Sequence, residues 1–309
     1  MLLLPVVVVL ALFLVKILFA SDGNATRQSQ TFVPAVNNAQ QTSRDPVVYA
    51  VGDIADCDQD NDTKTAALVD NSHATVVTLG DNVYDFGSAQ EFRDCYDTTW
   101  GKFYNRTHPA PGNHEYATRN ATGYFSYFGS RAGEAGKGWY SFDLGKWHLI
   151  ALNSNCSRID DGCGEGSKQM QWLRHDLAKS TKTCTLAYFH HPVLSSGLHG
   201  QTEAMLPVWK ELIRNNVDLV LTGHDHHYER FAPLDADGVF DGENGTREFV
   251  VGTGGRSHYP VIKQQQNSEA FNTATFGVLK LTLHELSYDW QFVPIEGSSF
   301  TDSGTGECH

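Results

Sequence analysis

Acidic, amide and imidazole side chains recur after short apolar runs, each time close to a glycine or a turn. They are Asp53, Asp81, Asn113 with His114, His190, and His224 with His226; the glycines are Gly52, Gly80, Gly112 and Gly223. Buried carboxylates and imidazoles brought together repel one another or lack partners unless a cation lies between them. Oxygen and imidazole ligands without a thiolate set suit hard to borderline metal ions. A single Gly-Asp turn is ordinary, but five such clusters in order predict a metal site.

The elements that must position these residues are strands, with helices between some of them. Strands are predicted at 47–51, 75–79, 147–152, 185–189 and 218–221, and helices at 167–180 and 202–215. Alternation of strand and helix implies parallel strands with helices packed outside. Open α/β sheets bind their ligands at the carboxyl ends of the strands. The glycines at these strand ends permit abrupt turns that would direct the side chains into one common site.

The C-terminal part has a different pattern, because its apolar runs follow one another without helices between them. Strands are predicted at 247–252, 275–284 and 287–293. Such a run favours a second, more antiparallel sheet packed on the first. The predicted fold class is therefore α/β, with two packed mixed β-sheets flanked by helices.

Composition fits a globular protein with an acidic surface. The chain has 309 residues, 36 Asp and Glu against 23 Lys and Arg, 14 His, a formal net charge of −13 and 40% hydrophobic residues. This hydrophobic content excludes disorder as the overall state. Nucleic-acid binding is not expected, because phosphate contacts need a basic face and the sequence has no Lys/Arg cluster.

The first twenty residues differ from the rest, since Lys16 is the single charge in an otherwise apolar stretch. Residues 1–20 are predicted to be either a cleaved secretory signal or an uncleaved membrane anchor. A polar linker is predicted at 21–45, rich in Ser, Asn, Gln and Thr. Both alternatives for 1–20 place the protein in the secretory pathway, secreted or anchored to a membrane.

Export changes how the cysteines are interpreted. The six cysteines show no zinc-like spacing, and an even number outside the cytosol favours disulfides. Cys156 and Cys163 flank a short polar segment and are the pair predicted from sequence. Asn-x-Ser/Thr triplets begin at Asn24, Asn61, Asn105, Asn120, Asn155 and Asn244. They indicate a glycoprotein, with chance occurrence as the alternative.

The ordered motifs resemble a known family. Gly52-Asp53, Gly80-Asp81-Asn82-Val83-Tyr84, Gly112-Asn113-His114-Glu115, His190 and Gly223-His224-Asp225-His226 resemble the five motifs of the calcineurin-like metallophosphoesterases. Two features of the sequence resemble those of one branch of this family, the purple acid phosphatases. Asp53-Ile54-Ala55 lacks the histidine that other members carry two residues after the aspartate, and Tyr84 follows Asp81 by three residues.

This resemblance implies a dinuclear metal centre in a four-layer sandwich. Asp53, Asp81, Tyr84 and His226 would hold a ferric ion, and Asp81 would bridge to a divalent ion (iron, zinc or manganese). Asn113, His190 and His224 would complete the second site. The family's ligand is the first histidine after the strand, so His190 is preferred to His191. Without the motif, Tyr84 after a strand would be interpreted as a packing residue.

The resemblance also implies a reaction, in which a metal-bound hydroxide attacks the phosphorus of an ester. His114 resembles the histidine that stabilises the transition state or protonates the leaving group. His199 lies where the family places a substrate-contacting loop, with an exposed loop histidine as the alternative. The catalytic domain is predicted at 46–296 and a C-terminal tail at 297–309, a short single-domain form without the β-sandwich that precedes this domain in plant members.

The predicted function is therefore a secreted or membrane-anchored phosphatase that hydrolyses small phosphomonoesters, favouring acidic pH because a ferric ion acidifies its water. Two alternatives stay open. One is a phosphodiesterase or nucleotidase that uses divalent metals only, and the other is a non-catalytic secreted binding protein on the same scaffold.

Overall fold

A computed structural model describes residues 45–70, 73–261 and 263–309. The predicted signal or anchor at 1–20, the triplet at Asn24 and nearly all of the predicted linker lie outside these residues. Among the described residues, no helix is both long enough and apolar enough to cross a membrane.

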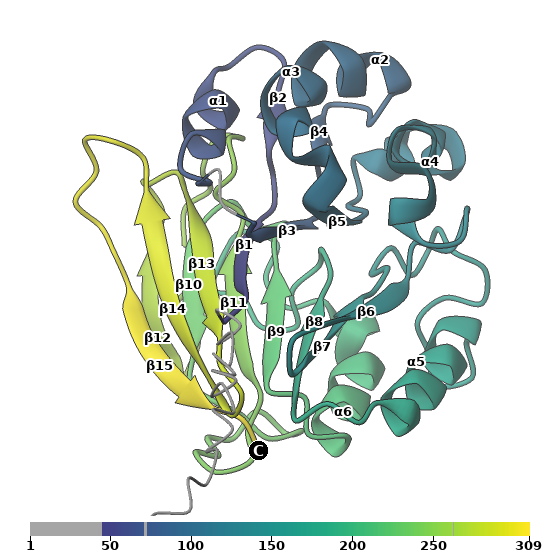
Figure 1. The fold of residues 1–309 in the computed structure, drawn as a ribbon, viewed down its shortest axis with the longest axis vertical. Helices are drawn as coiled ribbons and strands as arrows, with labels where there is room; N and C mark the ends of the chain where they lie inside the picture. The colour runs from purple at the N-terminus through teal and green to yellow at the C-terminus, as the bar shows by residue number, and fades with distance from the viewer. Residues whose placement is uncertain (1–44, 71–72, 262) are drawn as a thin grey trace, which may run out of the picture. The chain divides into compact units, whose positions relative to one another are not determined.

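Two mixed sheets form the framework (Figure 1). The first has the order β15-β14-β13-β1-β3-β5, and the second has the order β12-β10-β11-β9-β8-β7-β6. The strands of the first are β1 (Val47–Val51), β3 (Thr75–Leu79), β5 (Thr107–Ala110), β13 (Gly277–Leu283), β14 (Ser287–Pro294) and β15 (Ser303–Glu307). Those of the second are β6 (Tyr140–Leu144), β7 (Trp147–Ala151), β8 (Cys184–Tyr188), β9 (Leu219–Thr222), β10 (Tyr228–Phe231), β11 (Arg247–Val251) and β12 (Ser268–Asn272). The predicted fold class is confirmed.

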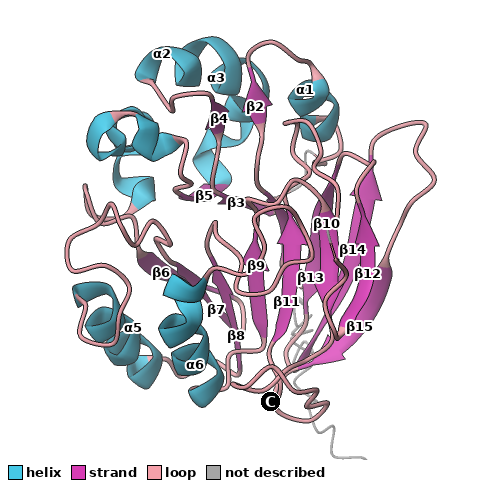
Figure 2. Ribbon diagram, turned by 180° about the vertical axis from the view of Figure 1, so that it is seen from behind, coloured by secondary structure: helices cyan, strands magenta, loops and turns pink. Residues whose placement is uncertain are grey.

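The helices gather in two places (Figure 2). α5 (Lys168–Lys179) and α6 (Leu206–Arg214) lie beside β6, β7 and β8, whereas the short elements lie at the other end of the view. These are α1 (Asn61–Ala66), α2 (Ala89–Glu91), α3 (Asp97–Thr99) and the strand pair β2 (Ala55–Asp56) and β4 (Val83–Tyr84), with α4 (Thr122–Phe128) near them. Both predicted helices are confirmed, and Ser167 caps α5 by accepting from the Met170 backbone N–H.

The predicted division of strands between the sheets was wrong. β13 and β14 do not form a separate sheet, because β13 pairs antiparallel with β1, which in turn pairs parallel with β3. β11 belongs to the other sheet, where it pairs parallel with β9. Each sheet therefore combines a parallel part with antiparallel strands. Figure 1 shows the purple β1 next to the yellow-green β13, from opposite ends of the chain.

Contacts between several strands and loops tie the two sheets together. A disulfide joins Cys184 in β8 to Cys308 just after β15. The indole N–H of Trp147 in β7 donates to the His284 carbonyl at 2.8 Å, and Arg230 in β10 pairs with Asp302 at 2.7 Å. Residues 297–309 are thus not a free tail, because β15 pairs with β14 and extends the first sheet.

Disulfides account for all six cysteines, which are Cys57–Cys95, Cys156–Cys163 and Cys184–Cys308. The predicted pair is confirmed. One predicted glycosylation triplet is excluded, because Asn155 is buried and its side-chain amide donates to the Pro111 carbonyl at 3.1 Å. Asn105, Asn120 and Asn244 are exposed, so glycosylation at these three stays a prediction.

Candidate metal centre

Both sheets contribute to one cluster of polar side chains. Asp53, Asp81 and Asn113 follow β1, β3 and β5 of the first sheet, whereas His190, His224 and His226 follow β8 and β9 of the second. Tyr84 comes from the short strand β4. The structure brings together the side chains of all seven residues predicted to bind metal, which is the arrangement that carboxyl strand ends produce in α/β folds.

The first set of donors consists of Asp53, Tyr84 and His226. The Tyr84 hydroxyl donates to Asp53 Oδ1 at 2.8 Å and lies 3.2 Å from His226 Nε2. His226 Nε2 is also 3.2 Å from Asp53 Oδ1. All three side chains are buried, so their polar atoms converge on a small volume shielded from solvent.

The second set consists of Asn113, His190 and His224, and Asp81 lies between the two sets. His190 Nε2 is 3.0 Å from Asn113 Oδ1 and 3.2 Å from His224 Nδ1. Asp81 Oδ2 accepts from the Tyr84 hydroxyl at 3.0 Å and lies 3.3 Å from His190 Nε2. One carboxylate oxygen thus contacts both sets, which is the position that a bridging ligand requires.

Backbone carbonyl groups orient two of the histidines. His190 Nδ1 donates to the Leu79 carbonyl at 2.8 Å, and His226 Nδ1 donates to the Ser257 carbonyl at 2.7 Å. A protonated Nδ1 leaves Nε2 available toward the cluster, as is usual for metal-binding histidines. His224 differs, because it directs Nδ1 toward His190.

Three of the predicted ligands have a left-handed backbone. Asp53, Asp81 and His224 have φ values of 62°, 47° and 68°. Such values are uncommon for residues with a Cβ and concentrate at functional sites. The prediction that the glycines before these residues permit abrupt turns therefore holds for only some of them. Gly80 makes a turn with φ of 87°, whereas a Cβ on Gly112 would overlap the Asp81 side chain.

The electrostatics of the cluster favour a bound cation. Burial raises the pKa of Tyr84 well above its usual value, and the charges of Asp53 and Asp81 raise it further. Burial opposes charge on His190, but Asp81 outweighs this and raises the His190 pKa to about 9. A cation among these donors would relieve the repulsion between the acidic groups. Carboxylate, phenol, amide and imidazole donors fit the predicted pair of metal ions.

His114 lies over the first set of donors. Its ring centroid is 4.3 Å from that of Tyr84, and its Nδ1 donates to the Asp85 carbonyl at 2.6 Å. Nε2 therefore faces the cluster, 3.9 Å from Asp81 Oδ2. The side chain is 31% exposed, so a bound substrate could reach this nitrogen. The catalytic contact of His114 stays a prediction.

His199 and Tyr259 flank the cluster on the side of the histidines. The exposed His199 stacks on His224 with ring centroids 4.3 Å apart, so it lies beside the cluster, and its contact with substrate stays a prediction. Tyr259 stacks on His226 at 4.0 Å and contacts His199 at 5.3 Å. Tyr259 directly follows no predicted strand and belongs to no motif, so its place at the site could not be predicted from the sequence.

Glu115 holds two of the strand-end loops, a role that was not predicted from the sequence. Its carboxylate is fully buried and accepts from the backbone N–H groups of Gly112 (2.6 Å), Asp81 (3.0 Å) and Asn82 (2.8 Å). The loops after β3 and β5 are therefore fixed to one side chain. The sequence signal for Glu115 is its place in the polar run Asn113-His114-Glu115, which lies beside a buried strand.

Buried carboxylates also hold the loop that carries His199. Glu248 accepts from the N–H groups of Val193 and Leu194, each at 3.0 Å. Asp225 accepts from the His199 N–H at 2.9 Å. Asp225 lies between His224 and His226 in the sequence. The same segment therefore supplies one residue to each donor set and also holds the loop that carries His199.

We predict that Glu248 makes the protein less stable as the pH rises. Burial, chiefly, raises the pKa of this carboxyl to about 8 from its usual 4.5. Its folded pKa exceeds its unfolded one, so the folded state holds the proton more tightly, and stability falls as pH rises from about 4.5 to 8. In Glu248→Gln the side chain cannot ionise. Its free energy of unfolding should therefore fall by about 3 kcal/mol less than that of the wild type as the pH rises from 5 to 8.

Urea unfolding of metal-free protein at both pH values measures this difference. Glu243→Gln is the control, because Glu243 is exposed. Parallel pH dependences of Glu248→Gln and the wild type would contradict the prediction.

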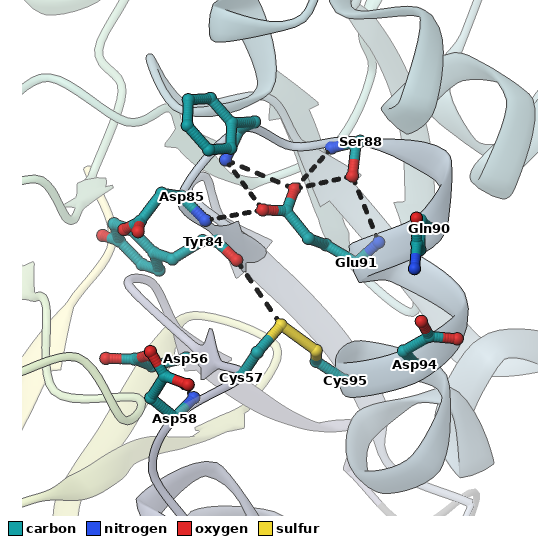
Figure 3. A pocket seen from close by; sticks show the side chains of 11 residues that line it. Asp56, Cys57, Asp58, Tyr84, Asp85, Ser88, Gln90, Glu91, Asp94 and Cys95 are labelled. Carbon is teal, nitrogen blue, oxygen red and sulfur yellow. Dashed lines mark hydrogen bonds between the residues drawn. A yellow bond between two sulfur atoms is a disulfide. The ribbon is translucent and has the colours of Figure 1, made fainter.

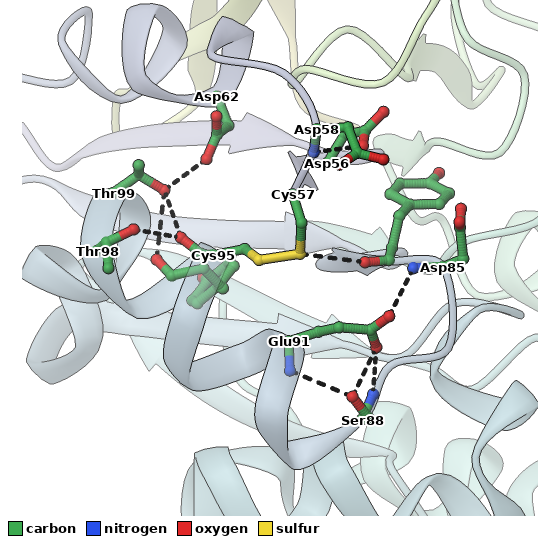
Figure 4. Close-up of a disulfide and its surroundings, with 12 residues drawn as sticks. Asp56, Cys57, Asp58, Asp62, Asp85, Ser88, Glu91, Cys95, Thr98 and Thr99 are labelled. Carbon is green, nitrogen blue, oxygen red and sulfur yellow. Dashed lines mark hydrogen bonds between the residues drawn. A yellow bond between two sulfur atoms is a disulfide. The ribbon is translucent and has the colours of Figure 1, made fainter.

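An acidic cavity of about 490 Å³ lies behind Tyr84 (Figure 3). Five carboxylates line it, namely Asp56, Asp58, Asp85, Glu91 and Asp94. The Cys57–Cys95 disulfide forms part of its wall (Figure 4), and Cys57 Sγ is 3.6 Å from the Tyr84 carbonyl oxygen. Arg256 compensates part of the charge, pairing with Asp56 at 2.7 Å and Asp85 at 3.1 Å while its guanidinium lies 4.8 Å over the Tyr84 ring.

Known proteins share this sequence pattern and fold. A sequence model of the calcineurin-like phosphoesterase family matches residues 46–228, more than half of the chain. Human acid phosphatase type 7 is 30% identical over 163 residues, which cover 45% of this chain and 35% of that protein. Mouse acid phosphatase type 7 is 26% identical over 205 residues, which cover 55% of this chain and 45% of that protein. The matches thus span less than half the length of these relatives.

Solved structures show the same fold. Purple acid phosphatase PPD1 from yellow lupin seeds superimposes with a TM-score of 0.70 at 19% identity, covering 86% of this chain and 54% of that one. GAP50, the anchor in the inner membrane complex of Plasmodium, superimposes with a TM-score of 0.66 at 14% identity, covering 86% and 90%. The match to the family model confirms the resemblance predicted from the motifs: the chain belongs to the calcineurin-like phosphoesterase family, and its relatives include acid phosphatases.

Proposed function

We propose that this protein is a metal-dependent phosphatase that hydrolyses phosphomonoesters. The observation that carries the proposal is the position of Asp81 Oδ2, which contacts Tyr84 of the first donor set and His190 of the second. When bound, two cations would polarise the phosphate ester and lower the pKa of a water molecule that attacks it. Tyr84 in the first set favours a ferric ion there and a divalent ion, iron, zinc or manganese, in the second.

The chain's own residues would orient the ester and handle a proton. His114 directs Nε2 toward the cluster and, when protonated there, would donate to the leaving oxygen. The fixed Nδ1 hydrogen bond keeps this nitrogen in place before substrate binds, which reduces the reorganisation that the transition state requires. His199, exposed beside His224, would contact the substrate.

We also propose that the protein acts outside the cytosol. The three disulfides support this, because such bonds persist in oxidising compartments. The apolar residues 1–20 and the exposed Asn105, Asn120 and Asn244 triplets support the same route. A net charge of −13 favours small phosphorylated substrates over nucleic acids.

Loss of colour in Tyr84→Phe is the expected result that tests the ferric site. Purified wild type should contain iron, absorb visible light through a tyrosinate-to-iron transition, and hydrolyse p-nitrophenyl phosphate faster than the bis-ester below neutral pH. Tyr84→Phe lacks the phenol oxygen and should lose this absorption. Tyr259→Phe is the matched control, because Tyr259 stacks on His226 without belonging to the donor sets.

The other outcomes distinguish the alternatives. Colourless, active protein containing only divalent metals, with a preference for the bis-ester, favours the phosphodiesterase or nucleotidase. Metal-replete protein that hydrolyses neither ester favours a binding protein on this scaffold.

A further inference from the structure

A second cavity adjoins the donor set of Asn113, His190 and His224. It measures about 390 Å³, and its walls include Asn113, Ser154, Ser157, Arg158, His191 and Thr202. Because Asn113 belongs to both the donor set and the cavity wall, the two are contiguous. An ester whose phosphate lies at the metal centre can therefore place the rest of its structure in this cavity.

The walls of this cavity are fixed relative to the metal centre. Ser154 Oγ accepts from the His191 backbone N–H at 2.9 Å and lies 2.8 Å from His191 Nδ1. The buried Asn155 amide donates to the Pro111 carbonyl, two residues before Asn113. The Cys156–Cys163 disulfide then closes the loop that carries Arg158. The cavity is thus a formed part of the fold rather than a gap between independent loops.

The charge of this cavity is opposite to that of the rest of the molecule. None of its lining residues is Asp or Glu, whereas five carboxylates line the cavity behind Tyr84 in Figure 3. Arg158 is exposed at its edge, and within the described part of the chain its guanidinium has no acidic partner. An unpaired arginine with five N–H donors suits a carboxylate or a phosphate. Neighbouring hydroxyl groups of Ser157 and Thr202 add further donors.

We propose that this cavity binds the leaving group and selects substrates that carry a second anionic group. The class is a phosphomonoester whose alcohol also bears a carboxylate or another phosphate, held by Arg158. In the reaction, water replaces the alcohol at phosphorus, inorganic phosphate leaves, and the second anion stays on the released alcohol. The inference rests on the proposed phosphatase function and adds the substrate class to it.

Matched esters test this inference. 3-Phosphoglycerate and glycerol 3-phosphate differ in one carboxylate, and glycerol 1,3-bisphosphate supplies a second phosphate instead. The metal-replete wild type should prefer an anionic ester to glycerol 3-phosphate about tenfold in kcat/KM, a preference that increasing salt weakens. Arg158→Gln should lose most of that preference, because its kcat/KM for the two anionic esters should fall about tenfold toward the value for glycerol 3-phosphate. Arg93→Gln, an exposed arginine outside both cavities, should retain it.

Binding is measured separately from turnover by calorimetry with the phosphonate analogues, in which a CH₂ group replaces the ester oxygen. Their Kd values should show the same preference and the same loss in Arg158→Gln. Loss confined to the carboxylate or to the bisphosphate identifies which anion the cavity takes. The same Kd ratio in the wild type, Arg158→Gln and Arg93→Gln overturns the inference. Absence of turnover for all three esters overturns the proposed function instead, while the calorimetry still decides the inference.

Discussion

Replacing Asp81 with asparagine is expected to lower metal content and turnover more than any other single change of a ligand. One oxygen of this carboxylate lies 3.0 Å from the Tyr84 hydroxyl and 3.3 Å from His190 Nε2, so both donor sets depend on it. An amide has almost the same shape but no charge to balance two cations. Removing even an outer partner of a metal ligand costs about 10- to 100-fold in affinity. We expect a larger loss here, and a fall in kcat of about a thousandfold, or ~4 kcal/mol.

Metal analysis after gel filtration and steady-state kinetics measure these losses. His199→Ala is the matched comparison, because His199 lies against His224 from the exposed side and should cost about tenfold or less. Metal-free Asp81→Asn should melt close to the metal-free wild type and should lose the rise in Tm that added metal produces. Equal losses in the two variants would refute the ranking of Asp81 above His199.

Much of this centre could be predicted because strand ends are visible in a sequence. Apolar runs such as 47–51 and 75–79 predicted β1 and β3, and the parallel arrangement placed Asp53 and Asp81 at the same edge. The prediction needed no pairing partners, since the side chains follow the strands whichever strands are neighbours. This is why the site was brought together as expected even though the division of strands between the sheets was wrong.

Pairing between distant strands could not be predicted in the same way. β1 and β13 are separated by more than two hundred residues, and an apolar run predicts a strand without specifying which strand is its neighbour. Supporting residues were missed for a related reason. Asp225 and Glu248 act through backbone N–H groups of segments far away in sequence, and a buried carboxylate bound to such distant N–H groups leaves no pattern of its own.

Glu115→Ala is expected to weaken both the fold and the metal centre. The fully buried carboxylate accepts from Gly112, Asp81, Asn82 and, at 3.4 Å, Val83, so its removal takes the acceptor from four buried N–H groups. Each costs about 1–3 kcal/mol, and a water entering the space would satisfy some of them. We expect the free energy of unfolding to fall by about 4 kcal/mol. Metal affinity should fall about 10- to 100-fold, because the Asp81 and Asn113 loops lose their shared anchor.

Two comparisons separate this effect from a general loss of charge. Glu134→Ala removes an exposed carboxylate whose partner is Lys137 and should cost less than about 1 kcal/mol. Glu115→Gln keeps one acceptor oxygen but turns an NH₂ group toward N–H donors. Its loss of unfolding free energy should therefore lie between those of Glu115→Ala and Glu134→Ala. Urea unfolding of the metal-free proteins and metal titration provide the values. If Glu115→Ala were as stable as Glu134→Ala and bound metal normally, the loops would have to be held by their strands alone. The left-handed backbone of Asp81 would then persist without the acceptor that its N–H group uses in the structure.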